Sequence, residues 1–244
     1  MLVGSADVAR LAERAGTIES WATESLRLEN VETLTVVYEI ESAGAEDLLL
    51  PALHPTIPPI AAWTFHRAAA SSAGPFTLAE LRIGCRFGVR PRGFVAGAFV
   101  DGAGAASLLS TWGYRAEVAD VRLQRFYDEV IGTVAIDGRP VLAALLLDPD
   151  PLSPSDVQQI ATMVLARTPR GIRLVQVEPE LTIRRAERGR PRLDHFDAAA
   201  WGADGVRPAY AVSASTTVSD MTVPPIRYVA KPDVLAFEGT EAVP

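Results

Sequence analysis

Charged and apolar side chains alternate along the stretch FTLAELRIGCRFGV, residues 76–89. In a β-strand, the period of two would place Ala79, Leu81, Ile83, Cys85 and Phe87 on a core face. The opposite face would then carry Leu78, Glu80, Arg82, Gly84 and Arg86. A carboxylate beside guanidinium groups can transfer a proton or hold a carboxylate ligand. The pattern equally fits a solvent-facing strand with exposed ion pairs, which contribute little to stability.

Other residue types that carry chemistry are sparse. The three histidines, His54, His66 and His195, lie far apart, whereas metal sites usually need two ligands at short spacing. Cys85 is the only cysteine, so an internal disulfide and a cysteine-rich zinc site are excluded. No phosphate-binding loop, dinucleotide fingerprint or G-x-S-x-G elbow occurs. We therefore expect no metal and no cofactor, while a Ser-His-Asp arrangement of distant residues stays open.

The basic residues are almost all arginine. Of 23 basic residues, 22 are Arg and one is Lys231. Coding bias explains this composition, but it leaves a single candidate for any mechanism that needs a lysine amine. The net charge is −7, and basic residues are scattered among acidic ones, so we expect no nucleic-acid partner.

The sequence shows no sign of a membrane or export segment. The longest apolar run, residues 141–147, is far too short to cross a bilayer. Asp7, Arg10, Glu13 and Arg14 interrupt the region where a secretory signal needs an apolar run. These features predict a cytoplasmic protein with no membrane partner.

Short strand-like segments dominate the chain. Helices are predicted at residues 7–15, 104–111 and 156–164, and a hairpin is predicted where Asp137-Gly138-Arg139 joins residues 129–136 to 140–148. Many strands with few helices and no alternating βαβ order indicate an α+β, mainly antiparallel β protein, with a barrel or barrel-like sheet. We expect one domain over residues 1–244, with an N-terminal helical extension at residues 1–30.

Five segments together resemble the acetoacetate decarboxylase superfamily from about residue 33 to residue 223. They are LHPTIPP (53–59), GPFTLAELRIGCR (74–86), RPRGF (90–94), WGY (112–114) and LARTPRG (165–171). The resemblance implies a closed, cone-like antiparallel β-barrel with a few peripheral helices. It also implies an apolar pocket inside the barrel and assembly into homo-oligomers.

The resemblance also shows what this chain lacks. In the decarboxylases, a lysine in a W-G-[WY]-P-K-K segment forms a Schiff base with the keto acid. When aligned on Trp112, Gly113 and Tyr114, the chain has Arg115 in place of the proline, Ala116 in place of the nucleophilic lysine and Glu117 in place of the next lysine. Arginine cannot substitute, because its guanidinium stays protonated. The family's active-site glutamate matches Glu80, which favours an inward orientation for that strand.

Two functions follow from these observations. The first is an enzyme, of the lyase or isomerase type, that acts on a small keto or carboxylate metabolite without an imine, in secondary metabolism. Dehydration, enolisation, cyclisation and imine-free decarboxylation all fit it. Glu80 would donate or accept the proton, with its pKa raised by the apolar barrel. The expected substrate-binding residues are Arg82, Arg86, Trp112, Tyr114, Arg115, His54 and Phe65.

The second function is a non-catalytic small-molecule binding or carrier protein of the same fold. A third and weaker hypothesis keeps decarboxylation through Lys231, which lies in RYVAKPDV near the C-terminus.

Overall fold

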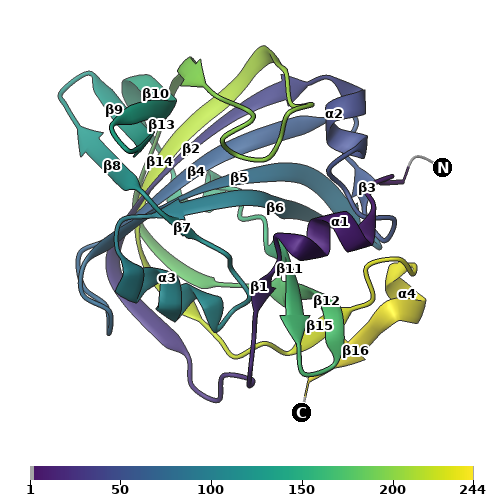
Figure 1. Cartoon of the computed structure of the whole chain (residues 1–244). Helices are drawn as coiled ribbons and strands as arrows, with labels where there is room; N and C mark the ends of the chain where they lie inside the picture. Colours follow the sequence, from purple (N-terminus) through teal and green to yellow (C-terminus); the bar gives the residue numbers. More distant parts are fainter. Residues whose placement is uncertain (1–2, 244) are drawn as a thin grey trace.

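Long antiparallel strands build most of the molecule (Figure 1). The computed structural model describes residues 3–243. The long strands are β2 (Leu26–Ile40), β4 (Ile60–Ala68), β5 (Phe76–Phe87), β6 (Arg90–Val100), β8 (Asp120–Arg125), β9 (Glu129–Ile136), β10 (Arg139–Leu152), β11 (Thr162–Thr168), β12 (Gly171–Val177), β13 (Glu180–Phe196) and β14 (Pro208–Val223). The short strands are β1 (Gly16–Thr17), β3 (His54–Pro55), β7 (Glu117–Val118), β15 (Tyr228–Ala230) and β16 (Thr240–Ala242).

The strands form one curved sheet with two ends. Its hydrogen-bonded order is β16-β15-β12-β11-β6-β5-β4-β2-β14-β13-β10-β9-β8. All neighbours on this path are antiparallel except β11 and β6, which pair in parallel through residues 162 and 163. The mainly antiparallel β fold is therefore confirmed, but the closed barrel is not, because the end strands β16 and β8 do not pair with each other.

The helices are short and lie at the periphery of the sheet (Figure 1). They are α1 (Val8–Glu13), α2 (Ser42–Glu46), α3 (Ala103–Ser110) and α4 (Ala236–Gly239). α1 and α3 confirm two of the predicted helices. None of the helices in residues 3–243 has the length and apolar character needed to span a membrane.

The helix predicted at residues 156–164 is wrong. A single 3-10 turn, Pro154–Asp156, is followed by a segment without regular structure, and β11 begins at Thr162. β11 pairs with β12 along its whole length, from Thr162 opposite Val177 to Thr168 opposite Gly171. These cross-strand hydrogen bonds outweigh the weak helical pattern of the isolated sequence.

Alternation along the central strands separates two apolar clusters. The first contains Leu34, Trp63, Phe65 and Leu81, on one face of β2, β4 and β5, and Trp201 from the segment between β13 and β14. The second contains Leu26, Leu28, Leu78, Trp112 and Met221. Neighbouring residues of a strand point to opposite faces. The residues that adjoin Leu34 on β2, Trp63 on β4 and Leu81 on β5 therefore face away from the first cluster.

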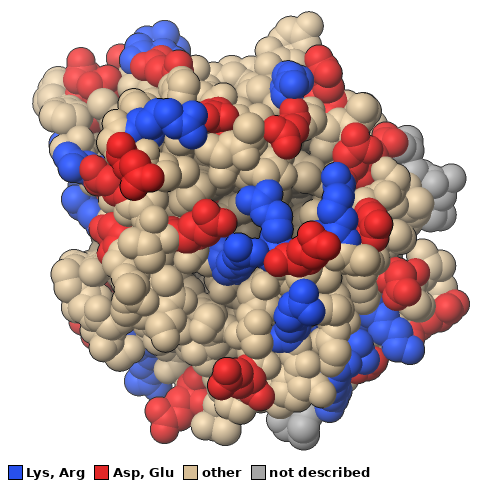
Figure 2. All heavy atoms as spheres, in the orientation of Figure 1, with Lys and Arg blue, Asp and Glu red and all other residues tan. Residues whose placement is uncertain are grey.

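The outer surface carries both signs of charge. Figure 2 shows Arg side chains interleaved with Asp and Glu over the face in view, with no patch of one sign. Several form exposed ion pairs, such as Arg122 with Asp120 and Arg190 with Asp148. Pairs of this kind contribute little to stability.

Gly132 of β9 allows close packing against the central strands. A Cβ atom at this position would overlap the Phe65 ring. We expect Gly132→Ala to lower the free energy of unfolding by about 1–3 kcal/mol in urea denaturation, because a buried aromatic ring must move. Adding Phe65→Leu should restore part of the loss.

Gly104→Ala in α3 is the matched control. Its Cβ would lie 3.7 Å from the nearest atom, the Ala73 carbonyl oxygen, and alanine favours a helix. This variant should be as stable as the native chain or slightly more stable. Equal unfolding free energies for Gly132→Ala and the native chain would contradict the packing described for β9.

Candidate active site

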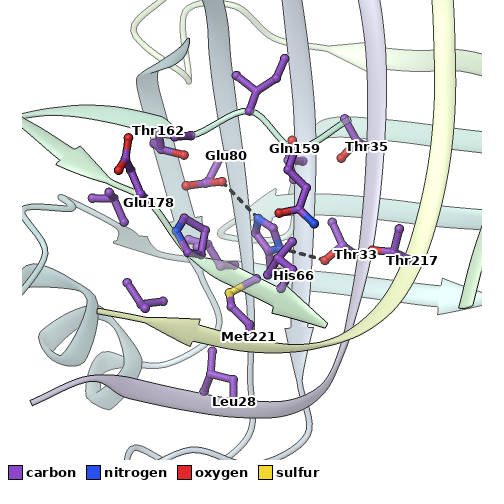
Figure 3. Close-up of a pocket in the computed structure, with 18 of the residues that line it drawn as sticks. Leu28, Thr33, Thr35, His66, Glu80, Gln159, Thr162, Glu178, Thr217 and Met221 are labelled. Carbon is purple, nitrogen blue, oxygen red and sulfur yellow. Dashed lines mark hydrogen bonds and ion pairs between the residues drawn. The ribbon is translucent and has the colours of Figure 1, made fainter. Parts of the chain in front are cut away.

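A cavity of about 320 Å³ lies on the inner side of β2, β4, β5 and β14. Most of its wall is apolar, and the second apolar cluster supplies many of the side chains. The apolar lining residues include Leu26, Leu28, Phe76, Leu78, Leu109, Trp112, Val177, Leu181, Ile183, Met221 and Val223. An apolar cavity with a few convergent polar groups is the usual form of a small-molecule site (Figure 3).

Glu80 and Arg82 form an ion pair inside this cavity. The Glu80 side chain is 0 % exposed and that of Arg82 18 % exposed. Arg82 Nε donates to Glu80 Oε2 at 2.8 Å, and Arg82 Nη2 contacts the same oxygen. The two residues are neighbours on one face of β5, so the strand itself brings them together. The charged face of β5 therefore points into the cavity at these positions.

His66 of β4 completes the polar cluster (Figure 3). Its Nε2 atom lies 3.2 Å from Arg82 Nη2 and 3.4 Å from Glu80 Oε2. Its Nδ1 atom lies 3.0 Å from the hydroxyl oxygen of Thr33, which sits opposite it on β2. Nε2 therefore faces both the guanidinium and the carboxylate, whereas Nδ1 pairs with the Thr33 hydroxyl.

His66 was not among the site residues expected from the sequence, although its position in the strand pattern indicates it. In WTFH, residues 63–66, the aromatic Trp63 and Phe65 alternate with Thr64 and His66. Both aromatic rings belong to the first apolar cluster, so the polar pair must face the other side of the strand.

The charges around Glu80 determine its protonation state. Burial raises the pKa of this carboxyl, but the Arg82 guanidinium and the hydrogen-bonded His66 ring lower it more, to about 2. The expectation that an apolar barrel would raise this pKa is therefore wrong. Glu80 is ionised near neutral pH, so it can accept a proton but cannot supply one.

The second oxygen of Glu80 is free. Oε1 is buried and makes no hydrogen bond to another residue within 3–243. The Tyr114 side chain lies near both Glu80 and Arg82. Burial raises the pKa of Tyr114 well above its ordinary value, and the Glu80 carboxylate raises it further. Tyr114 therefore stays protonated, and its hydroxyl is a hydrogen-bond donor within reach of the Glu80 and Thr162 side chains.

Of the expected site residues, Glu80, Arg82, Trp112 and Tyr114 line the cavity. Arg86 does not, because β5 has left the cavity by this position and its side chain is exposed. Arg115 is also exposed and donates to the Glu13 carbonyl oxygen.

Phe65 and His54 lie outside the cavity as well. Phe65 points into the first apolar cluster on the opposite face of β4. His54 is buried on β3, opposite Arg86 in the strand register, and is not among the residues that line the cavity.

The amine of Lys231 lies elsewhere. Lys231 is exposed just after β15, and its backbone N–H donates to the Gly239 carbonyl oxygen. No lysine is found among the described residues that line the cavity. Ala116 and Glu117 do not reach it either.

One side of the cavity is closed by irregular backbone. Residues 157–161, between the 3-10 turn and β11, all line it. Gln158, Gln159 and Ile160 are also exposed to solvent, so this segment separates the cavity from bulk water. Beside it, Glu178 lines the cavity and accepts a hydrogen bond from Arg92 at 2.5 Å.

No obvious metal centre is present: residues 3–243 contain no group of three His, Cys, Asp or Glu side chains that could hold an ion. The described residues that line the cavity supply two carboxylates, Glu80 and Glu178, together with a guanidinium, an imidazole and a phenol.

Solved structures share this fold. An acetoacetate decarboxylase from Legionella pneumophila aligns with a TM-score of 0.73 and 19 % identity, over 86 % of this chain and 88 % of that one. An acetoacetate decarboxylase-like enzyme from Sphingomonas wittichii RW1 aligns with a TM-score of 0.67 and 18 % identity, over 84 % and 93 %. The enduracididine biosynthesis enzyme MppR, complexed with pyruvate, aligns with a TM-score of 0.65 and 18 % identity, over 85 % and 89 %.

A search of curated protein sequences found no match. The family model for acetoacetate decarboxylase (ADC), in contrast, matches residues 15–231, which is most of the sequence. The chain therefore belongs to the acetoacetate decarboxylase family.

Proposed function

We propose that this protein is an enzyme that moves a proton at the carbon next to a carbonyl group, without a covalent imine. The supporting observation is the buried cluster of Glu80, Arg82, His66 and Tyr114, which lies in a largely apolar cavity without an amine. The only lysine of the chain is exposed outside that cavity. The segment at 115–117 reads Arg-Ala-Glu where the decarboxylases carry proline and two lysines.

Glu80 would be the proton acceptor. Arg82 and His66 approach Oε2, whereas Oε1 has no partner among the described residues and is available to the substrate. In the step, Oε1 takes a proton from the α-carbon, the C–H electron pair forms a C=C bond, and the carbonyl oxygen becomes an enolate. Return of the proton to another position completes an isomerisation. Alternatively, the enolate electron pair re-forms the C=O bond and moves to a new C=C bond, and the β-hydroxyl group takes the proton back from Glu80 and leaves as water, which completes a dehydration.

A carboxylate with a low pKa is a weak base, so the enolate must be well stabilised. Tyr114 is protonated and lies beside Glu80 and Arg82, where it can donate to the enolate oxygen. Arg82 supplies the positive charge of the cluster. Hydrogen bonds in a cavity that excludes water stabilise such an anion far better than they would in bulk solvent.

The neighbours in structure support a carbonyl substrate. MppR, an enzyme of enduracididine biosynthesis, is known in complex with pyruvate and with a condensation product of pyruvate and imidazole 4-carboxaldehyde. This likeness supports our proposal of a role in secondary metabolism, in which the protein acts on a keto or carboxylate compound as a lyase or isomerase. We also infer a cytoplasmic homo-oligomer that needs no cofactor.

The alternative is a non-catalytic carrier of the same fold. The Glu80–Arg82 pair favours it in one respect, since a buried ion pair can be purely structural. A carrier needs only the cavity and its apolar wall.

Exchange with deuterated water separates the two functions. We expect the protein to catalyse deuterium incorporation at the α-carbon of members of a panel of β-keto acids and hydroxyketones, measured by NMR. Glu80→Gln should lower the rate at least about 100-fold, in line with typical general-base contributions. Glu117→Gln, which removes an exposed carboxylate outside the cavity, is the matched control and should keep the rate. Ligand binding without exchange or product would establish the carrier.

Borohydride trapping tests the absence of an imine. Reduction with acetoacetate present should leave the intact mass of the protein unchanged, because the only lysine lies outside the cavity. The Lys231→Arg variant gives the background signal. A stable adduct on Lys231 would overturn the imine-free mechanism.

The ionised state of Glu80 predicts how stability depends on pH. Its pKa in the folded chain, about 2, is below the ordinary value of 4.5. The group therefore stabilises the fold above about pH 4.5, and this contribution, on the order of 3 kcal/mol, is lost as the pH falls toward 2. In urea denaturation between pH 7 and pH 3, the stability advantage of the native chain over Glu80→Gln should shrink on acidification. An advantage that stays constant or grows would show that Glu80 is not held ionised.

A further inference from the structure

Four neighbouring strands present an ordered set of polar side chains to the cavity. Across β14, β2, β4 and β5, one row of directly opposed residues reads Ser215, Thr35, Thr64 and Glu80. The next row reads Thr217, Thr33 and His66. All seven residues line the cavity. The acid–base cluster thus continues sideways into a wall of hydroxyl groups.

Most of these hydroxyls have no partner in the protein. The Thr33 hydroxyl pairs with His66, as described above. Within residues 3–243, the hydroxyls of Thr35, Thr64, Ser215 and Thr217 make no hydrogen bond, although Thr64 and Thr217 are buried. Buried polar groups are normally hydrogen-bonded, so groups left free in a cavity indicate a polar ligand or ordered water.

The hydroxyl wall carries no charge. Among the described residues that line the cavity, the only Arg or Lys is Arg82, which is already bound to Glu80. Figure 3 shows Thr33, Thr35 and Thr217 on the opposite side of His66 from Glu80, with Met221 and Leu28 along another wall. Neutral groups that contain oxygen can form hydrogen bonds with such a wall. A carboxylate placed there would lose its hydration without gaining an ion pair with a cation.

We propose that Thr35, Ser215 and Thr217 form a second subsite, which binds the uncharged, hydroxyl-bearing end of the substrate. This proposal rests on the function above, with the reacting carbonyl at Glu80. Neighbouring strands are about 4.8 Å apart, so the three spacings from β5 to β14 make a path of roughly 14 Å along the curved sheet. A short keto acid cannot reach both places. The substrate is an extended, neutral ketone with hydroxyl groups about 10 Å from its carbonyl.

The cavity can hold a molecule of this kind. Its volume of about 320 Å³ falls at the small end of typical ligand pockets and is large for acetoacetate or pyruvate. Leu181, Ile183 and Met221 also line it and supply an apolar surface for the chain that joins the two polar ends.

Three probes of equal chain length test the subsite. They are decan-2-one, 9,10-dihydroxydecan-2-one and 9-oxodecanoate, and their dissociation constants are measured by calorimetry. The proteins are the native chain, the triple variant Thr35→Val/Ser215→Ala/Thr217→Val, and Thr182→Val, which removes an exposed hydroxyl outside the cavity. Urea denaturation checks that each variant is folded.

We expect the triple variant to bind the diol about tenfold more weakly than the native chain does, the effect of losing two or so neutral hydrogen bonds. Its affinity for decan-2-one should change less than twofold or improve. Thr182→Val should match the native chain for every probe, and 9-oxodecanoate should bind more weakly than the diol.

Several results would overturn the subsite. These are equal loss of affinity for the diol and for decan-2-one, a preference for the carboxylate, and failure of the diol to bind the native chain. The measurement needs no turnover and is repeated with Glu80→Gln. A preference for the diol without proton exchange would refute the proposed reaction but keep the subsite. Proton exchange without a preference for the diol would refute the subsite but keep the proposed reaction.

Discussion

The buried ion pair between Glu80 and Arg82 is the interaction on which the rest of the site depends. An isolated carboxylate in an apolar cavity would take up a proton, because burial alone raises its pKa. Arg82, two residues along the same strand, and His66 from the neighbouring strand reverse this effect. The same contacts occupy Oε2 and leave Oε1 open. One electrostatic arrangement therefore sets the charge of Glu80 and leaves Oε1 outside the ion pair, while burial, and then the Glu80 carboxylate, keep Tyr114 protonated.

Strand register gives this arrangement its order. Because β14, β2, β4 and β5 are antiparallel neighbours, polar residues at alternating positions fall into rows that cross the sheet. The opposite face of the same strands holds Trp63 and Phe65 in the first apolar cluster, so the polar rows have a rigid support. A shift of one residue in β4 would bring these rings into the cavity and remove His66 from it. The same strand register therefore determines both which polar residues line the cavity and which apolar residues pack in the core.

The sequence predicted much of this structure, and its failures have physical causes. Alternation in residues 76–87 and the family resemblance correctly oriented Glu80 and Arg82, but the same period could not show that β5 leaves the cavity before Arg86. Phe65 was expected at the site and His66 was not, although the alternation of Trp63 and Phe65 with Thr64 and His66 places the polar pair on the cavity side. The pKa of Glu80 is lowered first by Arg82, two residues away on the same strand, and then by His66, which lies 14 positions away in the sequence. Strand pairing replaced the helix predicted at 156–164, and closure of the sheet depends on which strands end up at its two edges.

The segment at residues 157–161 is the longest irregular stretch of the cavity wall among the described residues. It belongs to no helix or strand, yet all five of its residues face the cavity. Substitutions on β2 or β14 risk disturbing a sheet that spans the molecule, whereas changes in this segment leave the strand ladder intact. Sequence changes among relatives that share the fold are therefore tolerated most easily in this segment. Such changes would alter which molecules enter the cavity and leave the cluster of Glu80, Arg82 and His66 intact.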